Sequence, residues 1–381
     1  MVLTGRPTWA EIDMDALVFN LRNIQKKGGE AEIMAVVKAN AYGHGGGSVA
    51  MELESRGVKF FGVATCQEGE ELREKGIKGS IIILGGIFRG EAESVLKNDF
   101  TPVTYRLETF RELSKEAKKS GKNIKVQVKI DTGMGRVGIL PQEIEDFFLK
   151  IKSFKNIEVE GLLSHLAVAN QEDDECREFT SRQLETLLGA IKKINALGFY
   201  PPLKHIANSA ALASYPVVPF NLIRPGLMLY GSYPSLPLKE KVSLRPVMSL
   251  KTRIIHLKRV PKDFSVSYGR IFITKKESLI ATLPVGYADG YSRALSNRGE
   301  VLIGGKRAPV AGVVCMDMVM VDVTAISGVE IGEEVVILGN QGQETISAEE
   351  IAQKAGTISY EFFCGISKRV PRVYLKKGKA V

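Results

Sequence analysis

The sequence has few cysteines and no segment suited to crossing a membrane. Its four cysteines, Cys66, Cys176, Cys315 and Cys364, lie far apart and form no CxxC pair, so neither a zinc site nor a disulfide framework is indicated. The first residues lack the basic start and apolar core of a secretory signal, and no apolar run approaches the roughly 20 residues that span a bilayer. We therefore expect free thiols, no metal, no membrane partner and a cytoplasmic location.

Long blocks of one charge are also missing. The formal net charge is +9, but lysines and arginines are scattered, and the densest basic stretches, 118–125 and 375–381, are typical of solvated loop or terminal segments. This distribution favours small anionic ligands over nucleic acid. A hydrophobic fraction of 44% and a charged fraction of 25% are typical of a folded globular protein.

Several catalytic motifs are absent as well. The glycine-rich segment GHGGGS (43–48) lacks the lysine of a P-loop and does not complete GxGxxG. There is no HExxH and no G-x-S-x-G elbow. These absences argue against a P-loop nucleotide hydrolase, a zinc protease and a serine hydrolase of the common types.

Short β-rich apolar runs alternate with amphipathic stretches of helical length from residue 31 to about 230. The expected strands are 31–38, 60–65, 80–86, 101–105, 125–131, 159–165, 202–207 and 221–226. The expected helices between them include 45–57, 67–76, 106–121, 141–154 and 178–198, with apolar positions three and four residues apart. About eight βα units is the number that closes a parallel barrel.

The pattern changes after about residue 240. The runs 247–260, 278–288, 300–314, 318–324 and 333–339 are β-rich and separated by Gly, Pro and charged turns, with one plausible helix at 347–356. We therefore predict an α/β protein with an N-terminal (β/α)8 TIM barrel, residues 1–240, and a C-terminal mostly-β domain, residues 241–381. The first ten or so residues could pack with the β domain.

Polar residues follow the apolar runs where the strands of such a barrel would end. A lysine directly after a buried strand, as Lys38 is, becomes partly desolvated, which lowers its pKa and frees an amine for Schiff-base chemistry. The alternative is a lysine that extends to the surface. Because the carboxyl ends of the strands meet at one face, we expect one cationic pocket for an anionic, carbonyl-bearing cofactor. It would contain Lys38, Lys129, Asp131, Arg136, His165, His205, Ser209 and Arg224.

Ser209 lies where a helix should begin after its strand. A serine there is most often an N-cap, but the same helix start can also bind phosphate. Each histidine, taken alone, is more often a core or surface group than a catalytic one, so the prediction depends on the set of residues together.

Ordered motifs along almost the whole chain resemble those of the alanine racemase family, in which a barrel that binds pyridoxal phosphate is joined to a C-terminal β domain. They are VVKANAYGHG (36–45), KIDTGMGRVG (129–138), IANSAA (206–211), IRPGLMLYG (223–231), VSYG (266–269), PVGYADGY (284–291), CMDM (315–318) and SYEF (359–362).

The resemblance implies pyridoxal 5'-phosphate as cofactor, bound covalently to Lys38 as an aldimine. It implies that the phosphate is held by Tyr42, Ser209, Gly226, Leu227 and Tyr360. Arg224, supported by His205, would face the pyridine nitrogen, and Arg136 would reach the phenolic oxygen. Lys129 matches a position that is often carbamylated in the family, which we treat as a hypothesis.

The resemblance also implies a second catalytic base. Tyr268 would serve one face of the substrate and Lys38 the other, with His165 as the hydrogen-bond partner of the tyrosine. Met316 and Asp317 resemble substrate-side residues which, like the tyrosine, reach the site from the other subunit of a homodimer.

The expected activity is interconversion of L-alanine and D-alanine, an isomerase reaction that supplies D-alanine for peptidoglycan. Three alternatives stay open: a racemase for serine or another amino acid, a barrel protein that binds pyridoxal phosphate for homeostasis, and a decarboxylase with a similar barrel. The VSYG and CMDM segments argue against the homeostasis protein.

Overall fold

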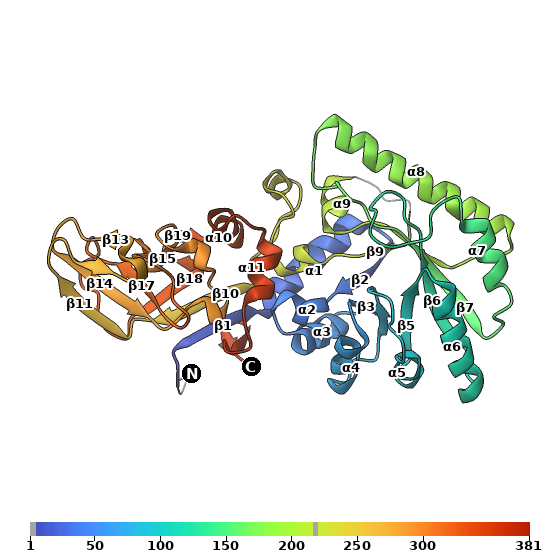
Figure 1. The fold of residues 1–381 in the computed structure, drawn as a ribbon, viewed down its shortest axis with the longest axis horizontal. Helices are drawn as coiled ribbons and strands as arrows, with labels where there is room; N and C mark the ends of the chain where they lie inside the picture. The colour runs from blue at the N-terminus through green and yellow to red at the C-terminus, as the bar shows by residue number, and fades with distance from the viewer. Residues whose placement is uncertain (1–4, 216–219) are drawn as a thin grey trace.

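The computed structural model describes residues 5–215 and 220–381. Figure 1 shows two lobes along the long axis, a barrel of strands and helices and a β-rich lobe. Among the described helices, none combines the length and the apolar character needed to cross a bilayer.

Eight parallel strands form the barrel in the order β8-β7-β6-β5-β4-β3-β2-β9 within the described residues. They are β2 (Glu32–Val36), β3 (Phe60–Val63), β4 (Ser80–Ile83), β5 (Phe100–Thr104), β6 (Ile124–Lys129), β7 (Ile157–Leu163), β8 (Leu203–His205) and β9 (Leu222–Ile223). Just beyond β8 and β9, N of Arg224 donates to O of Ala207 over 2.9 Å and closes the ring. The predicted (β/α)8 barrel is confirmed.

Helices surround this barrel because each has one apolar face. On α6 the buried Phe110, Leu113 and Ala117 are three and four residues apart. The helices are α1 (Met14–Gly28), α3 (Gly46–Ser55), α4 (Cys66–Glu74), α5 (Ala92–Lys97), α6 (Leu107–Ser120), α7 (Ile144–Ile151), α8 (Asp174–Ala196) and α9 (Ser209–Ser214). The predicted helices between the strands are all present.

The second lobe is mostly β, as predicted. Its strands are β1 (Thr8–Asp13), β10 (Met248–Arg253), β11 (His256–Val260), β12 (Ser265–Val266), β13 (Phe272–Ile273), β14 (Ser278–Leu283), β15 (Glu300–Ile303), β16 (Lys306–Pro309), β17 (Val319–Asp322), β18 (Glu334–Gln341), β19 (Glu344–Ile346), β20 (Arg372–Lys376) and β21 (Lys379–Ala380). One sheet runs in the order β16-β15-β18-β10-β1-β20-β21, and another runs β11-β14-β17.

The prediction of one helix in this lobe was wrong. Besides α10 (Ala348–Ala355), which was predicted, the lobe contains α11 (Ser359–Gly365). Seven residues are too few to give a recognisable helical period in the sequence. The omission matters because α11 lies at the junction with the barrel (Figure 1).

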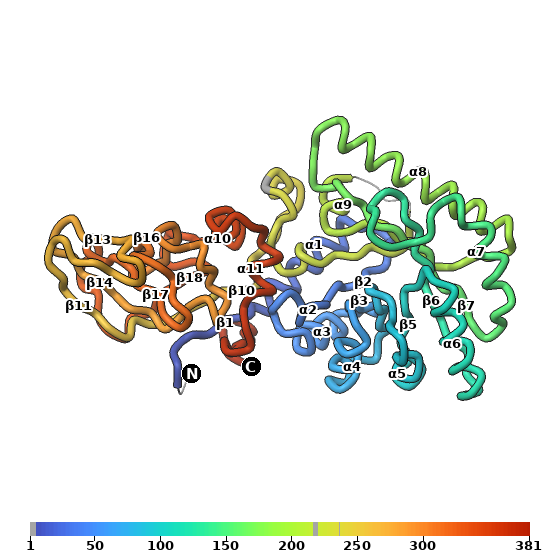
Figure 2. The backbone as a smooth tube through the Cα atoms, in the orientation of Figure 1, coloured from blue at the N-terminus to red at the C-terminus, as the bar shows by residue number. Residues whose placement is uncertain are grey.

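Segments near both ends of the chain, β1 and β20, lie side by side in the β lobe (Figure 2). Strand β1 pairs antiparallel with β10 and parallel with β20, so residues near the N-terminus belong to this sheet; residues 1–4 of the predicted segment lie outside the described residues. One buried apolar cluster includes Leu17 and Val128 from the barrel lobe and Leu250 and Val336 from the β lobe. The two lobes therefore share a core.

Candidate active site

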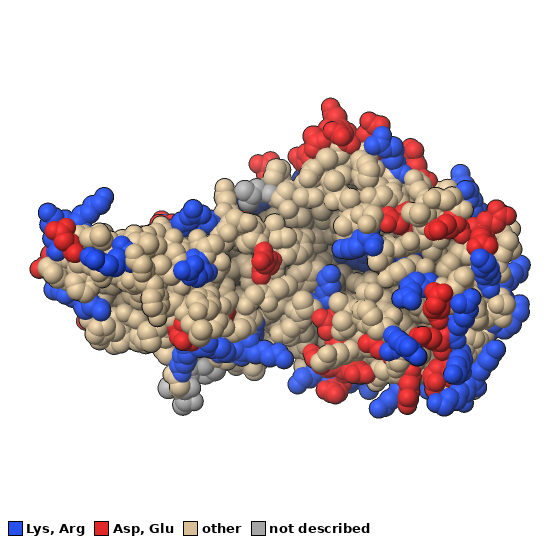
Figure 3. Space-filling model, viewed as in Figure 1, with Lys and Arg blue, Asp and Glu red and all other residues tan. Residues whose placement is uncertain are grey.

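A cavity of about 710 Å³ opens at the carboxyl ends of the barrel strands. Its lining includes ten of the residues predicted from the sequence: Lys38, Tyr42, Lys129, Arg136, His165, Ser209, Arg224, Gly226, Leu227 and Tyr360. Among the described lining residues there are four lysines and arginines and one carboxylate, that of Glu68. In Figure 3 lysine and arginine side chains border a hollow on the barrel lobe. The cavity has the size of a small-molecule site and a charge that suits an anion.

Lys38 begins an unusual turn, α2 (Lys38–Tyr42), directly after β2. Four consecutive residues, Ala39 to Tyr42, have φ between 51° and 55°, a left-handed conformation that costs roughly 1–2 kcal/mol per residue. The carboxylate of Glu68 stabilises the start of this turn by accepting N–H of Ala39 over 2.7 Å and N–H of Ala64 over 2.6 Å. Glu68, a residue of α4, therefore fixes the backbone directly after Lys38 and with it the position from which the lysine side chain extends.

His44 stabilises the end of the same turn through hydrogen bonds to its backbone carbonyls. This histidine is completely buried, and its Nδ1 lies 3.0 Å from O of Ala41 and 2.9 Å from O of Tyr42. Burial lowers the pKa of His44 to about 4, so the ring is neutral and Nδ1 carries the hydrogen that both carbonyls accept.

The pKa of Lys38 lies below its ordinary value. Burial is the main cause and the positive charge of Arg136 the next, while the carboxylate of Glu68 acts in the opposite direction. Each charge stabilises or destabilises the ammonium form according to its sign. A larger share of this side chain is therefore the nucleophilic neutral amine than in a free lysine.

Arg224 follows β9 and is buried beneath the cavity. Its Nη1 donates to Nδ1 of His205 over 2.7 Å, and its Nη2 donates to O of Ser164 over 2.8 Å and O of Ile206 over 3.0 Å. Burial lowers the pKa of Arg224 to about 10, so the guanidinium keeps its charge near neutral pH. This gives the cavity a cation that donates hydrogen bonds and accepts none.

His165 also faces this guanidinium, with Nδ1 3.3 Å from Nη2 of Arg224. Burial, followed by the charge of Arg224, lowers the pKa of His165 to about 3. The ring is therefore a neutral hydrogen-bonding group near neutral pH and not a cation.

Lys129 is the last residue of β6 and lines the cavity together with Arg136. Its pKa is lowered to about 8, first by burial and then by the charges of Arg136 and Arg224. Two basic side chains, Lys129 and Arg136, therefore share the lining of the cavity, and a substantial fraction of the Lys129 amine is neutral near pH 8.

Another part of the lining combines a hydroxyl, a glycine and two tyrosines. Asn208, not Ser209, caps α9, so the N-cap role considered for the serine is wrong. The Ser209 hydroxyl instead accepts N–H of Gly226 over 2.9 Å. A Cβ on residue 226 would lie only 2.6 Å from Oη of Tyr42. Because this residue is a glycine, the Tyr42 hydroxyl can approach the backbone of Gly226 closely. The ring of Tyr360, which α11 supplies, lies 5.8 Å from that of Tyr42.

Tyr268, Met316 and Asp317 lie elsewhere in the chain. None of them is among the described residues that line the cavity, and Tyr268 is 72% exposed. Strand β13, four residues after Tyr268, lies at the end of the β lobe away from the barrel (Figure 1). Within one chain the structure therefore does not bring Tyr268 to Lys38.

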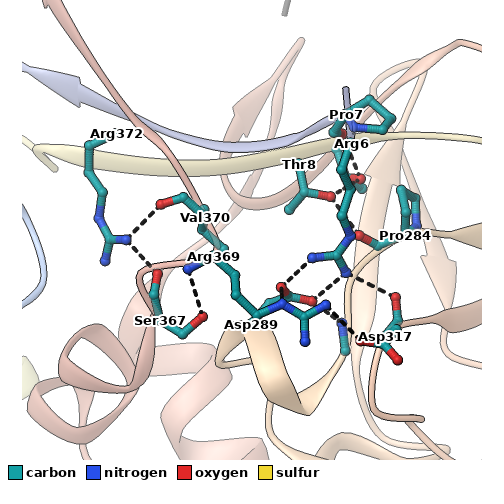
Figure 4. Close-up of polar contacts among 12 residues, drawn as sticks. Arg6, Pro7, Thr8, Pro284, Asp289, Asp317, Ser367, Arg369, Val370 and Arg372 are labelled. Atoms are coloured by element: carbon teal, nitrogen blue, oxygen red, sulfur yellow. Dashed lines mark hydrogen bonds and ion pairs between the residues drawn. The ribbon is translucent and has the colours of Figure 1, made fainter. Parts of the chain in front are cut away.

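The loop that bears Asp317 is firmly held (Figure 4). Arg369 donates to its carboxylate over 2.6 Å, and Arg6 donates to its backbone oxygen over 3.0 Å. Arg6 also pairs with Asp289, whose side chain is completely buried. Segments near the two ends of the chain thus converge on a loop that presents Met316 and Asp317 to the outside.

Sequence reasoning missed two residues of this region, Glu68 and Gln127. Thr65 and Glu68 have the spacing of a helix capping box, which would have assigned Glu68 to its own helix and not to Ala39. Gln127 is completely buried, and a polar residue inside an apolar strand is a signal that could have identified it.

The fold and the cavity together define a (β/α)8-barrel protein with a half-buried lysine and an excess of positive charge at the carboxyl ends of its strands, the arrangement of a barrel enzyme that binds an anion. Comparison with known proteins specifies the family. Residues 12–234 match the model of the alanine racemase N-terminal domain, and residues 247–374 match that of the alanine racemase C-terminal domain. The chain belongs to the alanine racemase family.

Full-length relatives agree with this assignment. The chain is 46% identical over 373 residues to an alanine racemase of Halothermothrix orenii, with 98% of each chain covered, and 46% identical over 378 residues to one of Geobacter sulfurreducens, again with 98% of each covered. The solved alanine racemase of Bacillus anthracis with bound L-Ala-P superposes with a TM-score of 0.94 at 35% identity, covering 100% of this chain and 98% of that one.

Proposed function

We propose that this chain is an alanine racemase that interconverts L-alanine and D-alanine with two bases and pyridoxal 5'-phosphate, and that it supplies D-alanine for peptidoglycan from the cytoplasm. The observation that carries the proposal is a half-buried lysine of lowered pKa, Lys38, in a cationic cavity of a chain that matches alanine racemases over nearly its full length.

The residues of the cavity fit this cofactor. The space that glycine leaves beside Tyr42 at Gly226 would admit a phosphate, with the hydroxyls of Ser209 and Tyr360 and the backbone at Leu227 nearby. Arg224 and Arg136 would bind the ring's polar atoms, and Lys38 would hold the group covalently. When bound, pyridoxal phosphate supplies a conjugated ring that delocalises the electrons left when the α-proton departs.

Lys38 is proposed as the base on one face of the substrate. Burial and Arg136 favour the neutral form of its amine, so Nζ can accept the α-proton and return it. The left-handed turn held by Glu68 would fix the approach of Nζ. Because racemisation needs proton exchange on both faces of a planar carbon, a second base is required.

Tyr268 of a second copy is proposed as that base. A free phenol has a pKa of about 10, so its Oη needs hydrogen bonds or positive charge nearby. The neutral His165 and the cationic Arg136 at the cavity could supply both. Met316 and Asp317, from the same β lobe of the second copy as Tyr268, would contact the substrate.

Arg224 is proposed to limit where protons can go. Its guanidinium keeps its charge near neutral pH and offers donors held in place by His205 and two carbonyls. The guanidinium can donate a hydrogen bond to the pyridine nitrogen of a bound cofactor but does not give it a proton. An unprotonated ring would delocalise electrons less strongly, which should restrain side reactions such as transamination. Lys129, if carbamylated, would become an anion that orients Arg136.

The same proposal requires a homodimer. Tyr268 cannot serve the cavity of its own chain, and the β lobe exposes several large apolar side chains: Tyr268, Ile271, Ile273, Tyr287, Met316 and Met318. The face of this lobe drawn in Figure 3 bears few charges compared with the barrel. An exposed apolar group of this kind is typical of a protein–protein contact, and a two-fold dimer would complete both sites.

A chiral assay of the purified protein tests the activity. We expect D-alanine from L-alanine, faster with added pyridoxal phosphate, and much slower turnover of L-serine and of basic amino acids. Preferential turnover of serine or a basic amino acid would replace alanine as the substrate. Cofactor binding without turnover of any amino acid would favour the homeostasis protein, and carbon dioxide release would favour the decarboxylase.

A further inference from the structure

Three buried side chains form a hydrogen-bonded series beneath the cavity. Gln127 from β6 lies with Oε1 2.9 Å from Nε2 of His205, and Nδ1 of His205 lies 2.7 Å from Nη1 of Arg224. Gln127 and His205 are 0% exposed and Arg224 is 5% exposed. The series thus connects the barrel interior to the cation of the cavity without passing through solvent.

The donors and acceptors of this series can be ordered in one way. A guanidinium only donates hydrogen bonds, so Nδ1 of His205 must accept from Arg224. A neutral imidazole that accepts at Nδ1 carries its hydrogen on Nε2, and that hydrogen needs an acceptor. Oε1 of Gln127 is that acceptor.

The opposite orientation of the Gln127 amide would break the series. Its NH2 group would then face Nε2 of His205, which would have to accept, and the hydrogen on Nδ1 would point at the donors of Arg224. In the observed orientation the cost is smaller, since among the described residues only Nε2 of Gln127 is left without a partner in this series. The donor of Arg224 at Nδ1 and the acceptor of Gln127 at Nε2 thus favour the same form of His205, with its hydrogen on Nε2.

The backbone around Gln127 is shaped to place this side chain. The pairing of β6 with β7 shifts register between Val126 and Gln127, where Gln127 comes opposite Gly161. A Cβ on Gly161 would lie 3.0 Å from Cγ and 3.1 Å from Cδ of Gln127, tighter than ordinary contact. The extra residue, Glu160, is on β7, and it brings Gly161 opposite Gln127, where the absence of a Cβ leaves the space that the glutamine side chain occupies.

We propose that Gln127 is a positioning residue that holds His205 in the Nε2–H form, so that Nδ1 accepts from Arg224 and keeps the guanidinium aimed at the cavity. Its kinetic consequence rests on the proposed racemase function, but the hydrogen-bond arrangement does not. Gln127 touches no reacting atom; it acts through His205 and Arg224.

Histidine-selective ¹⁵N NMR of the holoenzyme tests this arrangement without any mutation. The chain has four histidines, and His205→Asn assigns the signal. We expect His205 as the neutral form with hydrogen on Nε2. His44 is an internal control, because its Nδ1 faces two carbonyls and must carry the hydrogen. An Nδ1–H form or an imidazolium at His205 would overturn the proposal.

A variant separates positioning from simple packing. Gln127→Met keeps the volume but removes the acceptor, and we expect the Nε2–H signal of His205 to broaden or be replaced and kcat for alanine to fall roughly tenfold with KM changed less than about twofold. Gln183→Met, a buried glutamine outside the series, should leave the His205 signal unchanged. An unchanged His205 signal in Gln127→Met would also overturn the proposal. If wild-type His205 has the expected form but the enzyme racemises no amino acid, only the proposed function fails.

Discussion

Oε1 of Glu68 accepts the backbone N–H of Ala39 over 2.7 Å, one residue after Lys38. A carboxylate from α4 thus supports a strained left-handed turn and at the same time places a negative charge near the Lys38 amine. These two effects can be separated, because glutamine retains an acceptor oxygen but loses the charge.

Glu68→Gln should lower the pKa of Lys38 further. The carboxylate raises that pKa against the effects of burial and Arg136, so its removal favours the neutral amine. The measurement is the pH dependence of Lys38 acetylation in the cofactor-free protein, followed by mass spectrometry. Glu70→Gln is a matched control, since Glu70 is on the same helix but bonds to Ser94. A Lys38 pKa that is unchanged or higher in Glu68→Gln would show that the charge has no such role.

Arg224→Glu should increase transamination relative to racemisation. A carboxylic acid at this position can give a proton to a facing base, which the guanidinium cannot. We expect the pyruvate formed per racemisation event to rise about tenfold or more, equivalent to about 1.4 kcal/mol in relative barrier. Arg224→Lys keeps the charge and is the control. An unchanged product ratio in a folded Arg224→Glu enzyme would argue against the proposed role.

Lys129 should form a carbamate that depends on bicarbonate and pH. Only the neutral amine reacts, and because the pKa of Lys129 is lowered to about 8, the neutral fraction should increase from about pH 7 to about pH 9. The measurement is a ¹³C carbamate signal after addition of labelled bicarbonate. Lys125→Ala, which removes an exposed lysine from the same strand, should keep the signal, and Lys129→Ala should lose it. A signal absent from the wild-type protein, with activity insensitive to bicarbonate, would exclude the modification.

Two inactive variants should restore activity when they share a dimer. Lys38→Ala and Tyr268→Phe each remove one base, but a mixed dimer has one site with both bases. Random mixing of equal amounts makes about half of the dimers mixed, so about a quarter of wild-type activity should return. A chain that carries both substitutions should restore no activity when it is mixed with either single variant, because no site then has both bases. Mixed dimers that form and stay inactive would contradict sites shared between subunits.

The barrel and much of its cavity could be predicted from the sequence because parallel strands align their carboxyl ends. Lys38, His165 and Arg224 each follow an apolar run, and the closed ring brings all three to one cavity. Asp131 and His205 were predicted there too, but the described lining includes neither. The Asp131 carboxylate accepts N–H of Gly133 in its own turn over 2.9 Å, and His205 is completely buried and contacts the cavity residue Arg224.

Other features depend on geometry that no local pattern contains. The contact of Glu68 with Ala39 crosses from one βα unit to the next, and Gln127 on β6 meets His205 on β8 across the intervening strand β7. Helix α11 is too short to give a period. The roles assigned to Tyr268, Met316 and Asp317 stay predictions, because they depend on a second copy of the chain.

Borohydride trapping followed by peptide mapping is the most direct test that Lys38 holds the cofactor. The holoenzyme would be reduced, digested and analysed by mass spectrometry, with Lys129 as the competing amine of lowered pKa in the same cavity. We expect one pyridoxyl adduct, on the peptide that contains Lys38, and none in Lys38→Ala. An adduct on Lys129 or no adduct at all would contradict the proposed chemistry of this site.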